Sequence, residues 1–343
     1  DVFEGQTEDS EEIDVLVRGY VRKQHRRQKY RCRCGGCIKT APGPLKLVEG
    51  GRYSIPLAVE VACDKYGDHL PLERQARRMT REGLTLDSQT LWDMADRVAY
   101  LGYRTYRALQ SYVLSQHVLG ADETTWRLLG RSGKDAGPTE RWYVWIAHAP
   151  DAAYYLFEDS RSNDAGDKLL DKYEGVLMCD GYGVYKSLAK RNPKVLLAHC
   201  WSHIRRAFIE VQENFQAPVD EVLGYIGTLY ALESEFSKTD APSDEKRLDM
   251  RRTKSSEQLE KIEQWVWRYG QSTPPESGLS KAIKKMVNQW EGLVRFTTDA
   301  RIPLDNNGSE RDARLAVQGR KNHHGSKSKR GTDVAAPWWR AQS

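Results

Sequence analysis

Three acidic residues, Asp122, Asp180 and Glu310, occupy positions from which their carboxylates can act together. Asp122 and Asp180 each end a short apolar run, residues 118–122 and 176–180, as expected of buried strands. Glu310 lies in an Asn- and Ser-containing segment that reads as a helix start. Two carboxylates at strand ends and a third on a helix can converge on one point. Such a trio can hold two divalent cations roughly 3.5–4 Å apart, the spacing of two-metal phosphodiester chemistry.

The segments around the first two acids predict the elements that position them. Runs rich in aromatic and β-branched residues predict strands at 118–122, 141–148, 152–158, 175–180 and 194–199. Helices are predicted between the later strands, at 163–173 and 182–191. The order β-β-β-α-β-α-β predicts an α/β fold with a mixed five-stranded sheet. It matches an RNase H-like core over residues 118–203, with the first acid on the first strand and the second on the fourth.

The spacing of the acids predicts a large insertion. Asp122 and Asp180 are 58 residues apart (180 − 122), whereas Asp180 and Glu310 are 130 apart (310 − 180). The second gap is too long for a bare core, and its pattern is almost wholly helical. We therefore predict an all-helical insertion over residues 204–300. Residues 301–335 then carry the final catalytic helix and a basic tail, with Asp305 or Asn306 as the helix cap.

The residues before the first strand divide into three regions. Residues 1–14 carry seven acids and no base, which indicates a disordered acidic leader. Residues 15–54 are basic and end in a Pro- and Gly-rich linker. Residues 55–117 are predicted as a helical DNA-handling region, with helices at 55–81 and 88–117.

Six cysteines are present, and their spacing is not that of a disulfide-dense protein. Cys34 and Cys37 have the Cys-x-x-Cys spacing of a zinc knuckle, and Cys32 adjoins them. A tetrahedral site needs a fourth ligand, and no second Cys-x-x-Cys precedes these residues. The alternatives are a zinc site and a partial, zinc-knuckle-like half-site.

Basic residues are concentrated in two blocks, although the formal net charge is only +5. Residues 18–33 hold eight Lys or Arg, and residues 311–330 hold seven. Such blocks suit a phosphate backbone, although many basic runs are simply solvated faces. The candidate DNA-binding residues are Arg22, Lys23, Arg26, Arg27, Lys29, Arg320, Lys321 and Lys327.

Several motifs around the acids resemble one family. The segments 121–124, 179–182 and 306–311 look like the three signature segments of the DDE transposases of the insertion sequence 66 family. Residues 65–72 and 319–323 also match that pattern. The resemblance runs from about residue 20 to about residue 335, which is most of the chain. It indicates a fragment without the usual N-terminus, and the end at residues 336–343 is atypical for the family.

The resemblance implies a reaction, cofactors and partners. Asp122, Asp180 and Glu310 become the catalytic, metal-binding acids of a transposase that cleaves DNA and joins the 3′ end to a target. Two Mg²⁺ or Mn²⁺ ions are the implied cofactors, and the transposon terminal repeats and target DNA are the implied partners. A homo-oligomeric synaptic complex and accessory proteins of the same element are also implied. A cytoplasmic location is expected, because no apolar run approaches the roughly 18 residues of a membrane span.

Candidate accessory residues flank the acids. Cys200 and His203 resemble the Cys-x-x-His motif that follows the second acid in several DDE transposases. The alternative is a buried cysteine beside a half-exposed histidine. Arg314 shares a helix face with Glu310, either to bind phosphate or to pair with the glutamate. The remaining candidates, one beside the helix cap and one beside the acid, are Asn307 and Arg311.

Two other functions remain open from the sequence. A stand-alone RNase H-like nuclease would cut DNA but never join a 3′ end. A degenerate transposase remnant would bind DNA without catalysis. Serine-hydrolase and ATP-dependent chemistry are not predicted, because neither Gly-x-Ser-x-Gly nor a phosphate-cradling Gly-x-x-x-x-Gly-Lys motif is present.

Overall fold

The structure is a computed structural model that describes residues 11–13, 19–130, 138–239 and 243–339. Two compact units can be distinguished. The first comprises residues 1–65 and 70–98, and the second comprises residues 66–69 and 99–343. Most of the predicted acidic leader lies outside the described residues, as does the end of the chain from residue 340. No helix in the described ranges is long and apolar enough to span a bilayer.

The elements follow the chain in this order. The strands are β1 (Lys29–Arg31), β2 (Ile38–Thr40), β3 (Val118–Leu128), β4 (Glu140–Ala149), β5 (Ala152–Glu158), β6 (Gly175–Cys179) and β7 (Val195–His199). The helices are α1 (Ile55–Tyr66), α2 (Leu72–Arg81), α3 (Ser88–Leu114), α4 (Asn163–Leu170), α5 (Gly183–Arg191), α6 (Trp201–Ile209), α7 (Gln216–Phe236), α8 (Asp244–Met250), α9 (Ser256–Ser272), α10 (Gly278–Val287), α11 (Trp290–Val294), α12 (Asn307–His323) and α13 (Lys329–Ala335). Single turns are η1 (Gln212–Asn214), the π-helical η2 (Arg251–Ser255) and η3 (Arg295–Thr297).

The second unit is built on a five-stranded mixed sheet with the strand order β5-β4-β3-β6-β7. β3, β4 and β5 form an antiparallel meander, whereas β6 and β7 run parallel to β3. The predicted mixed five-stranded sheet with helices is therefore confirmed. β3 and β4 extend beyond the predicted runs because their aromatic and β-branched residues continue the pairing, up to Leu128 opposite Glu140.

Alternating side chains of the central strands serve two different cores. Leu119, Leu177 and Cys179 face a core that includes side chains of α3, α4 and α5. Val176 and Met178 face the opposite core, which the helices between β7 and α12 complete. Because successive side chains on a strand point to opposite faces, each strand residue is assigned to one core by its position.

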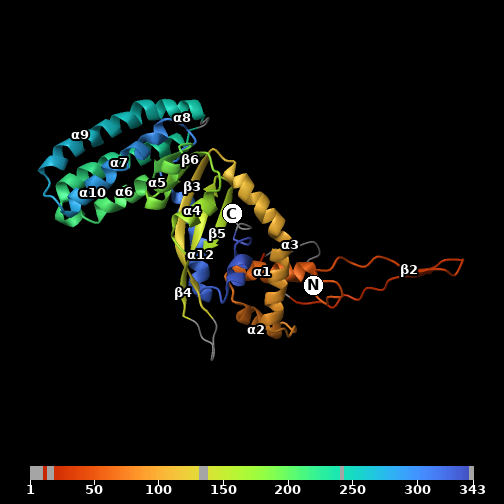
Figure 1. Ribbon diagram of the computed structural model, residues 1–343. Coiled ribbons are helices and arrows are strands. Elements are labelled where there is room, and N and C mark those ends of the chain that lie inside the picture. Colours follow the sequence, from red (N-terminus) through yellow and green to blue (C-terminus); the bar gives the residue numbers. More distant parts are fainter. Residues whose placement is uncertain (1–10, 14–18, 131–137, 240–242, 340–343) are drawn as a thin grey trace, which may run out of the picture. The chain divides into compact units, whose positions relative to one another are not determined.

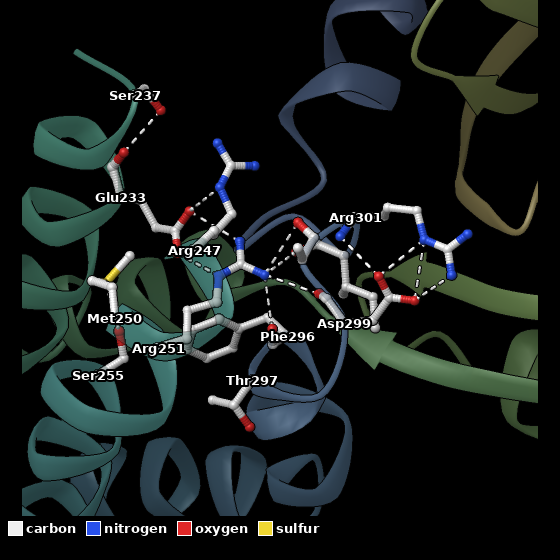
Figure 2. A network of polar contacts seen from close by, with 12 residues as sticks. Glu233, Ser237, Arg247, Met250, Arg251, Ser255, Phe296, Thr297, Asp299 and Arg301 are labelled. Atoms are coloured by element: carbon white, nitrogen blue, oxygen red, sulfur yellow. Dashed lines mark hydrogen bonds and ion pairs between the residues drawn. The ribbon is translucent and has the colours of Figure 1, made fainter. Parts of the chain in front are cut away.

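The predicted insertion consists of helices α6 to α11, and Figure 1 shows α6, α7, α9 and α10 lying together in one bundle. A buried arginine links this bundle to the chain that returns toward α12. The guanidinium of Arg251 donates to both carboxylate oxygens of Glu233, at 2.6 and 2.9 Å. It also donates to the carbonyls of Phe296, Asp299 and Ile302, at 2.8 to 3.1 Å (Figure 2). The insertion is thereby fixed to the segment that leads to Glu310.

The prediction of one helix over residues 55–81 was wrong. Two helices, α1 and α2, form instead, and residues 67–71 separate them. His69 has a left-handed backbone (φ 55°), and Pro71 precedes the first turn of α2. Proline disfavours a helical conformation in the residue before it, so the apolar periodicity cannot continue as one helix. Side chains of α1, α2 and the start of α3 share a small apolar core.

Trp339, the last residue that the structure describes, belongs to an aromatic cluster. Trp339 is fully buried, and its ring meets the rings of Trp126, Tyr155 and Phe157 at 5.2 to 5.7 Å. Aromatic rings at such separations stabilise one another beyond the area they bury. Trp126, Trp142, Trp145 and Trp201 are also buried.

Candidate functional site

The parallel pairing of β3 and β6 brings the first two acids to one edge of the sheet. Gly120 of β3 pairs with Met178 of β6. Two residues further on, the same register puts Asp122 beside Asp180, on strands roughly 4.8 Å apart. Both acids share the sheet face of Met178, because two residues restore the side-chain direction. The two carboxylates are therefore neighbours on the face toward the core of the insertion.

A local turn orients the second acid. Oδ1 of Asp180 accepts a hydrogen bond from the backbone N–H of Tyr182 at 2.8 Å. Gly181 between them has a φ of 87°, and a Cβ there would lie 2.4 Å from the side chain of Gln289. Glycine permits this conformation and this close approach. The turn leaves the other carboxylate oxygen of Asp180 for a ligand.

The third acid is carried by the first turn of α12, which docks on β3. The side-chain amide of Asn306 donates to the carbonyl of Ala121 at 2.8 Å, and Ser309 donates to Oδ1 of Asn306 at 2.7 Å. A Cβ on Gly120 would lie 2.2 Å from the Ser309 hydroxyl, so the helix approaches the strand only because residue 120 is glycine. Glu310 is thereby held beside the strand that carries Asp122.

One of the two predicted cap residues of this helix, Asn306, is its N-cap, but it does not cap through its side chain. The side chain contacts β3 instead. Asp305 accepts from the backbone N–H of Asn307 at 3.0 Å and from its side-chain amide at 2.7 Å. Asn307, a candidate accessory residue, therefore shapes this turn and is exposed beside the site.

A contact between a histidine of β4 and an aspartate of α12 also holds this helix against the sheet. Nδ1 of His148 in β4 lies 2.6 Å from a carboxylate oxygen of Asp312 in α12. The ring also lies against Gly308, where a Cβ would come within 2.2 Å of it. These contacts fix the rotation of α12, and so the direction of Glu310.

The three acids are coupled electrostatically. Burial, followed by the nearby Glu123 carboxylate, raises the pKa of Asp122 from 3.8 to about 7, and the charges of Asp180 and Glu310 raise it further within that total. Carboxylates that share a partly buried site resist simultaneous ionisation. A bound cation relieves this repulsion, so the site favours positive charge.

Glu123 itself points to the other face, because successive side chains on a strand alternate in direction. Its carboxylate accepts from Tyr185 Oη at 2.7 Å and forms an ion pair with Arg161. Glu123 therefore connects β3 to Tyr185 and Arg161 on the opposite face of the sheet. Its carboxylate does not point toward the three acids.

The donor set fits a hard divalent cation. Oε1 of Glu310 is buried and has no hydrogen-bond partner. An orphaned carboxylate oxygen beside two further carboxylates is a natural ligand for Mg²⁺ or Mn²⁺, which prefer oxygen. The ligand atoms of the three acids do not all lie within 4.8 Å of one another among the described residues, so they do not form a tight single-ion cluster.

Cys200 and His203 lie directly beside Glu310. Cys200 is buried, and its sulfur accepts from the backbone N–H of Asn306 at 3.2 Å. Nδ1 of His203 lies 3.7 Å from Oε1 of Glu310. Burial lowers the pKa of His203, which favours the neutral imidazole near pH 7. Cys200 is therefore buried, and His203 lies beside a candidate catalytic acid. The role of the two residues in catalysis stays a prediction.

The two arginines after Glu310 do not pair with it. Arg311 and Arg314 are exposed, and neither forms an ion pair within the part of the chain that the structure describes. Of the two roles considered for Arg314, only phosphate binding remains as a prediction.

The other basic candidates divide into two groups. Arg320 donates to the backbone carbonyl and hydroxyl of Thr125, so it anchors α12 to β3. The remaining candidates are all exposed and stay predictions: Arg22, Lys23, Arg26, Arg27, Lys29, Lys321 and Lys327.

The structure adds a groove that the sequence reading missed. It has a volume of about 520 Å³ and lies between α6, α7 and the turn before α12. Arg205 and Arg206 line it, both exposed and without an ion pair among the described residues. Ser202, beside His203, also lines it, as does Asn307. The only signal in the sequence was the Arg-Arg pair two residues after His203.

The knuckle-like cysteines lie on the β1–β2 hairpin of the first unit. Cys32 and Cys34 have sulfurs 2.8 Å apart, and the backbone N–H of Cys32 donates to the carbonyl of Cys37. All three are exposed. Zinc binding by this hairpin stays a prediction.

Replacing Asp122 by asparagine is expected to stabilise the metal-free protein above pH 7. The raised pKa means that the folded state binds a proton more tightly than the unfolded state, so this carboxyl's favourable contribution to stability is lost as pH rises from about 4 through about 7. The full difference corresponds to on the order of 4 kcal/mol. Thermal unfolding in chelator should show Asp122→Asn gaining most at pH 8, and gaining less at pH 5, where only part of the carboxyl's contribution has been lost. An equal change at both values would contradict the coupling.

Comparison with known proteins identifies the family to which the chain belongs. Residues 50–334 match the family described as Transposase IS66 family, and the chain belongs to this family.

Curated relatives come from Sinorhizobium fredii (strain NBRC 101917 / NGR234). The chain is 31% identical to "Uncharacterized protein y4jD" over 326 residues, which cover 91% of the chain and 63% of that protein. It is 32% identical to "Uncharacterized protein y4qI" over 335 residues, covering 91% of the chain and 60% of that protein. The chain thus spans about three fifths of the length of these relatives.

Proposed function

We propose that this chain carries the catalytic core of a DDE transposase, which cleaves DNA and transfers the 3′ end with Asp122, Asp180 and Glu310. The observation that carries the proposal is the convergence of three acids from distant segments. Asp122 and Asp180 share one edge through the β3–β6 register, and the docked start of α12 adds Glu310. The raised pKa of Asp122, to which both other acids contribute, supports the same grouping.

We propose that the sheet is an RNase H-like core. The strand order β5-β4-β3-β6-β7, with an antiparallel meander followed by two parallel strands, supports this assignment. So does the position of the acids, on the first and immediately after the fourth strand of the sheet. The family membership supports it independently.

The three carboxylates would hold two Mg²⁺ or Mn²⁺ ions. When bound, such ions lower the pKa of a water and neutralise charge on the leaving 3′ oxygen. The protein residues arrange this chemistry: the turn at Gly181 aims Asp180, and the docking of Asn306 on β3 aims Glu310. The imidazole of His203 lies 3.7 Å from Oε1 of Glu310 and would contact that carboxylate.

The groove beside the site is proposed to hold the DNA backbone. Arg205 and Arg206 supply unpaired positive charge next to the acids, and the hydroxyl of Ser202 and amide of Asn307 supply donors. Phosphate oxygens accept from all these groups. The groove would therefore position a strand whose scissile phosphate lies at the three carboxylates.

Replacing Arg205 and Arg206 together by alanine is expected to lower the affinity for DNA. The affinity of the variant should also depend less steeply on salt concentration. Each lost phosphate contact should reduce the slope of log K against log salt by about 1. Fluorescence anisotropy with duplex DNA at several salt concentrations measures the slope. Lys254→Ala is the matched control, because Lys254 is also exposed on the insertion but lies outside the groove. Equal slopes for the double variant and wild type would place the DNA elsewhere.

The first test of the proposal is metal binding. Calorimetric titration of Mn²⁺ into the purified chain should show binding that Asp122→Ala and Asp180→Asn each abolish. Absence of binding by wild type, or binding that neither substitution alters, would overturn the carboxylate site.

The second test separates the transposase from its two rivals. Wild-type chain is incubated with a plasmid and a labelled DNA end in Mg²⁺ or Mn²⁺. Nicking with joining of the labelled 3′ end supports a transposase. Nicking without joining would indicate a nuclease, and DNA binding alone would indicate a remnant.

Further partners follow from the proposed reaction. Synapsis of two DNA ends requires two active sites, so we propose a homo-oligomer bound to terminal repeats and target DNA. Accessory proteins of the same element remain part of the proposal.

A further inference from the structure

The edge of the sheet that carries the three acids also holds a thiol and an imidazole. One ligand atom each from Cys200, His203 and Glu310 lies within 4.8 Å of the other two, and no other described His, Cys, Asp or Glu residues form such a group. We propose that these three side chains form a binding site for a soft divalent cation such as Zn²⁺. The site shares Glu310 with the carboxylate trio, and this sharing alone rests on the proposed function.

The spacing of the ligand atoms suits zinc. Ligands at 2.0–2.3 Å from a tetrahedral zinc lie roughly 3.3–3.7 Å from one another. Nδ1 of His203 and Oε1 of Glu310 are 3.7 Å apart. This distance is too long for a hydrogen bond between them, yet it matches two ligands of one ion. Sulfur, nitrogen and oxygen together form a donor set that zinc accepts and Mg²⁺ does not.

The same two atoms face each other but form no hydrogen bond. Nδ1 of His203 and Oε1 of Glu310 are both buried and make no hydrogen bond. Buried polar atoms are rarely left unsatisfied in folded proteins, and an ion is one explanation when they face each other. The pair therefore points to a positively charged ligand between them.

The third ligand is prepared by the backbone. Cys200 caps the start of α6, and His203 lies in the first turn of that helix. The sulfur of Cys200 accepts from the backbone N–H of Asn306 at 3.2 Å. Hydrogen bonds from second-layer groups orient metal ligands and stabilise the charged form of a thiolate. Three protein ligands leave one tetrahedral position open, as in zinc sites that bind a water or substrate.

Occupancy of this site has a consequence for the proposed reaction. A zinc ion on Cys200 and His203 would also engage Glu310, which the proposed carboxylate site needs. Transition-metal affinities exceed those of Mg²⁺ at a site with sulfur and nitrogen donors. Low concentrations of Zn²⁺ are therefore expected to compete with Mg²⁺ for the shared glutamate.

Cobalt absorption tests the site directly. Co²⁺ replaces Zn²⁺ and gives a near-ultraviolet charge-transfer band only when a thiolate is a ligand. The full chain is prepared with Cys32→Ser, Cys34→Ser and Cys37→Ser, so that the exposed thiols of the hairpin do not contribute. One equivalent of Co²⁺ should produce the band in this background, and Zn²⁺ should displace it.

Two further substitutions assign the ligand. Cys200→Ser should abolish the band and weaken Zn²⁺ binding by at least the roughly 100-fold that loss of a group supporting a ligand can cause, because the ligand itself is removed. Cys179→Ser is the matched control, because Cys179 is also buried and lies 3.7 Å from Nδ1 of His199. The band should survive this change. A second ligand variant, Glu310→Gln, should keep the thiolate band but lower the affinity for Zn²⁺.

The outcomes separate this site from the proposed function. Asp122→Asn should remove Mn²⁺ binding at the carboxylates and leave the cobalt band intact. No band in the starting background, or a band that persists in Cys200→Ser, would overturn the soft-metal site without affecting the transposase proposal. A band that is lost only in Cys179→Ser would also overturn it, since the ligand would then be the other buried cysteine. Absent Mn²⁺ binding with an intact cobalt band would leave the soft-metal site and remove the carboxylate site.

Discussion

Asp180→Asn is expected to lower metal-dependent DNA nicking by about 10³-fold or more while leaving the fold intact. The substitution keeps the shape of the side chain, and the turn to the N–H of Tyr182 needs only an oxygen acceptor. It removes one negative charge from the three that would hold the cations. A loss of about 4 kcal/mol of transition-state stabilisation corresponds to about 10³-fold in rate. Single-turnover nicking of plasmid DNA in Mn²⁺ measures the change.

The control for this prediction is another acid on the same sheet. Glu123→Gln alters an acid next to Asp122 whose carboxylate instead contacts Arg161 and Tyr185. It should cost stability but retain most of the nicking rate at a temperature at which the variant is folded. If Glu123→Gln and Asp180→Asn reduced the rate equally, the acids of the active centre would have been assigned incorrectly.

Arg251→Met is expected to destabilise the second unit by about 3–5 kcal/mol. The side chain is 1% exposed, and its guanidinium satisfies Glu233 and several backbone carbonyls together (Figure 2). Removing one partner of a buried ion pair leaves an uncompensated charge, which costs this amount. The unpaired carbonyls of Phe296 and Ile302 add to the penalty. Urea unfolding followed by tryptophan fluorescence measures the loss.

Two further variants define the cause of that loss. Arg252→Met changes the next residue, which is exposed, and should alter stability by less than about 0.5 kcal/mol. Arg251→Lys keeps the charge but cannot bind Glu233 through two parallel hydrogen bonds, so it should recover only part of the loss. Full recovery by lysine would show that charge alone, and not the planar fork, joins the insertion to the returning chain.

The local sequence predicted the elements of the sheet well because each is encoded by nearby residues. Runs of apolar, aromatic and β-branched residues marked all five strands, and the helices between them had clear periodicity. Local reading failed where a single residue ends an element. The helix over residues 55–81 is broken near His69 and Pro71, although its apolar pattern continues.

The candidate acids were also visible in the sequence, since each stands at the end of a recognisable element. Their geometry was not. It depends on Gly120, whose lack of a side chain admits α12, and on Asn306, whose amide reaches across 185 residues to Ala121. Neither contact has a local pattern, because the partners are chosen by packing between distant segments.

The sequence by itself determined the strand and helix types and the family resemblance, and it indicated the three candidate acids. The tertiary structure alone decided which groups surround Glu310. Cys200 and His203 meet Glu310 across more than 100 residues of chain, and Arg251 joins the insertion to the segment that leads there. The physical reason is that strand and helix patterns arise from neighbours in sequence. Sites and buried ion pairs arise from packing, which a linear pattern does not encode.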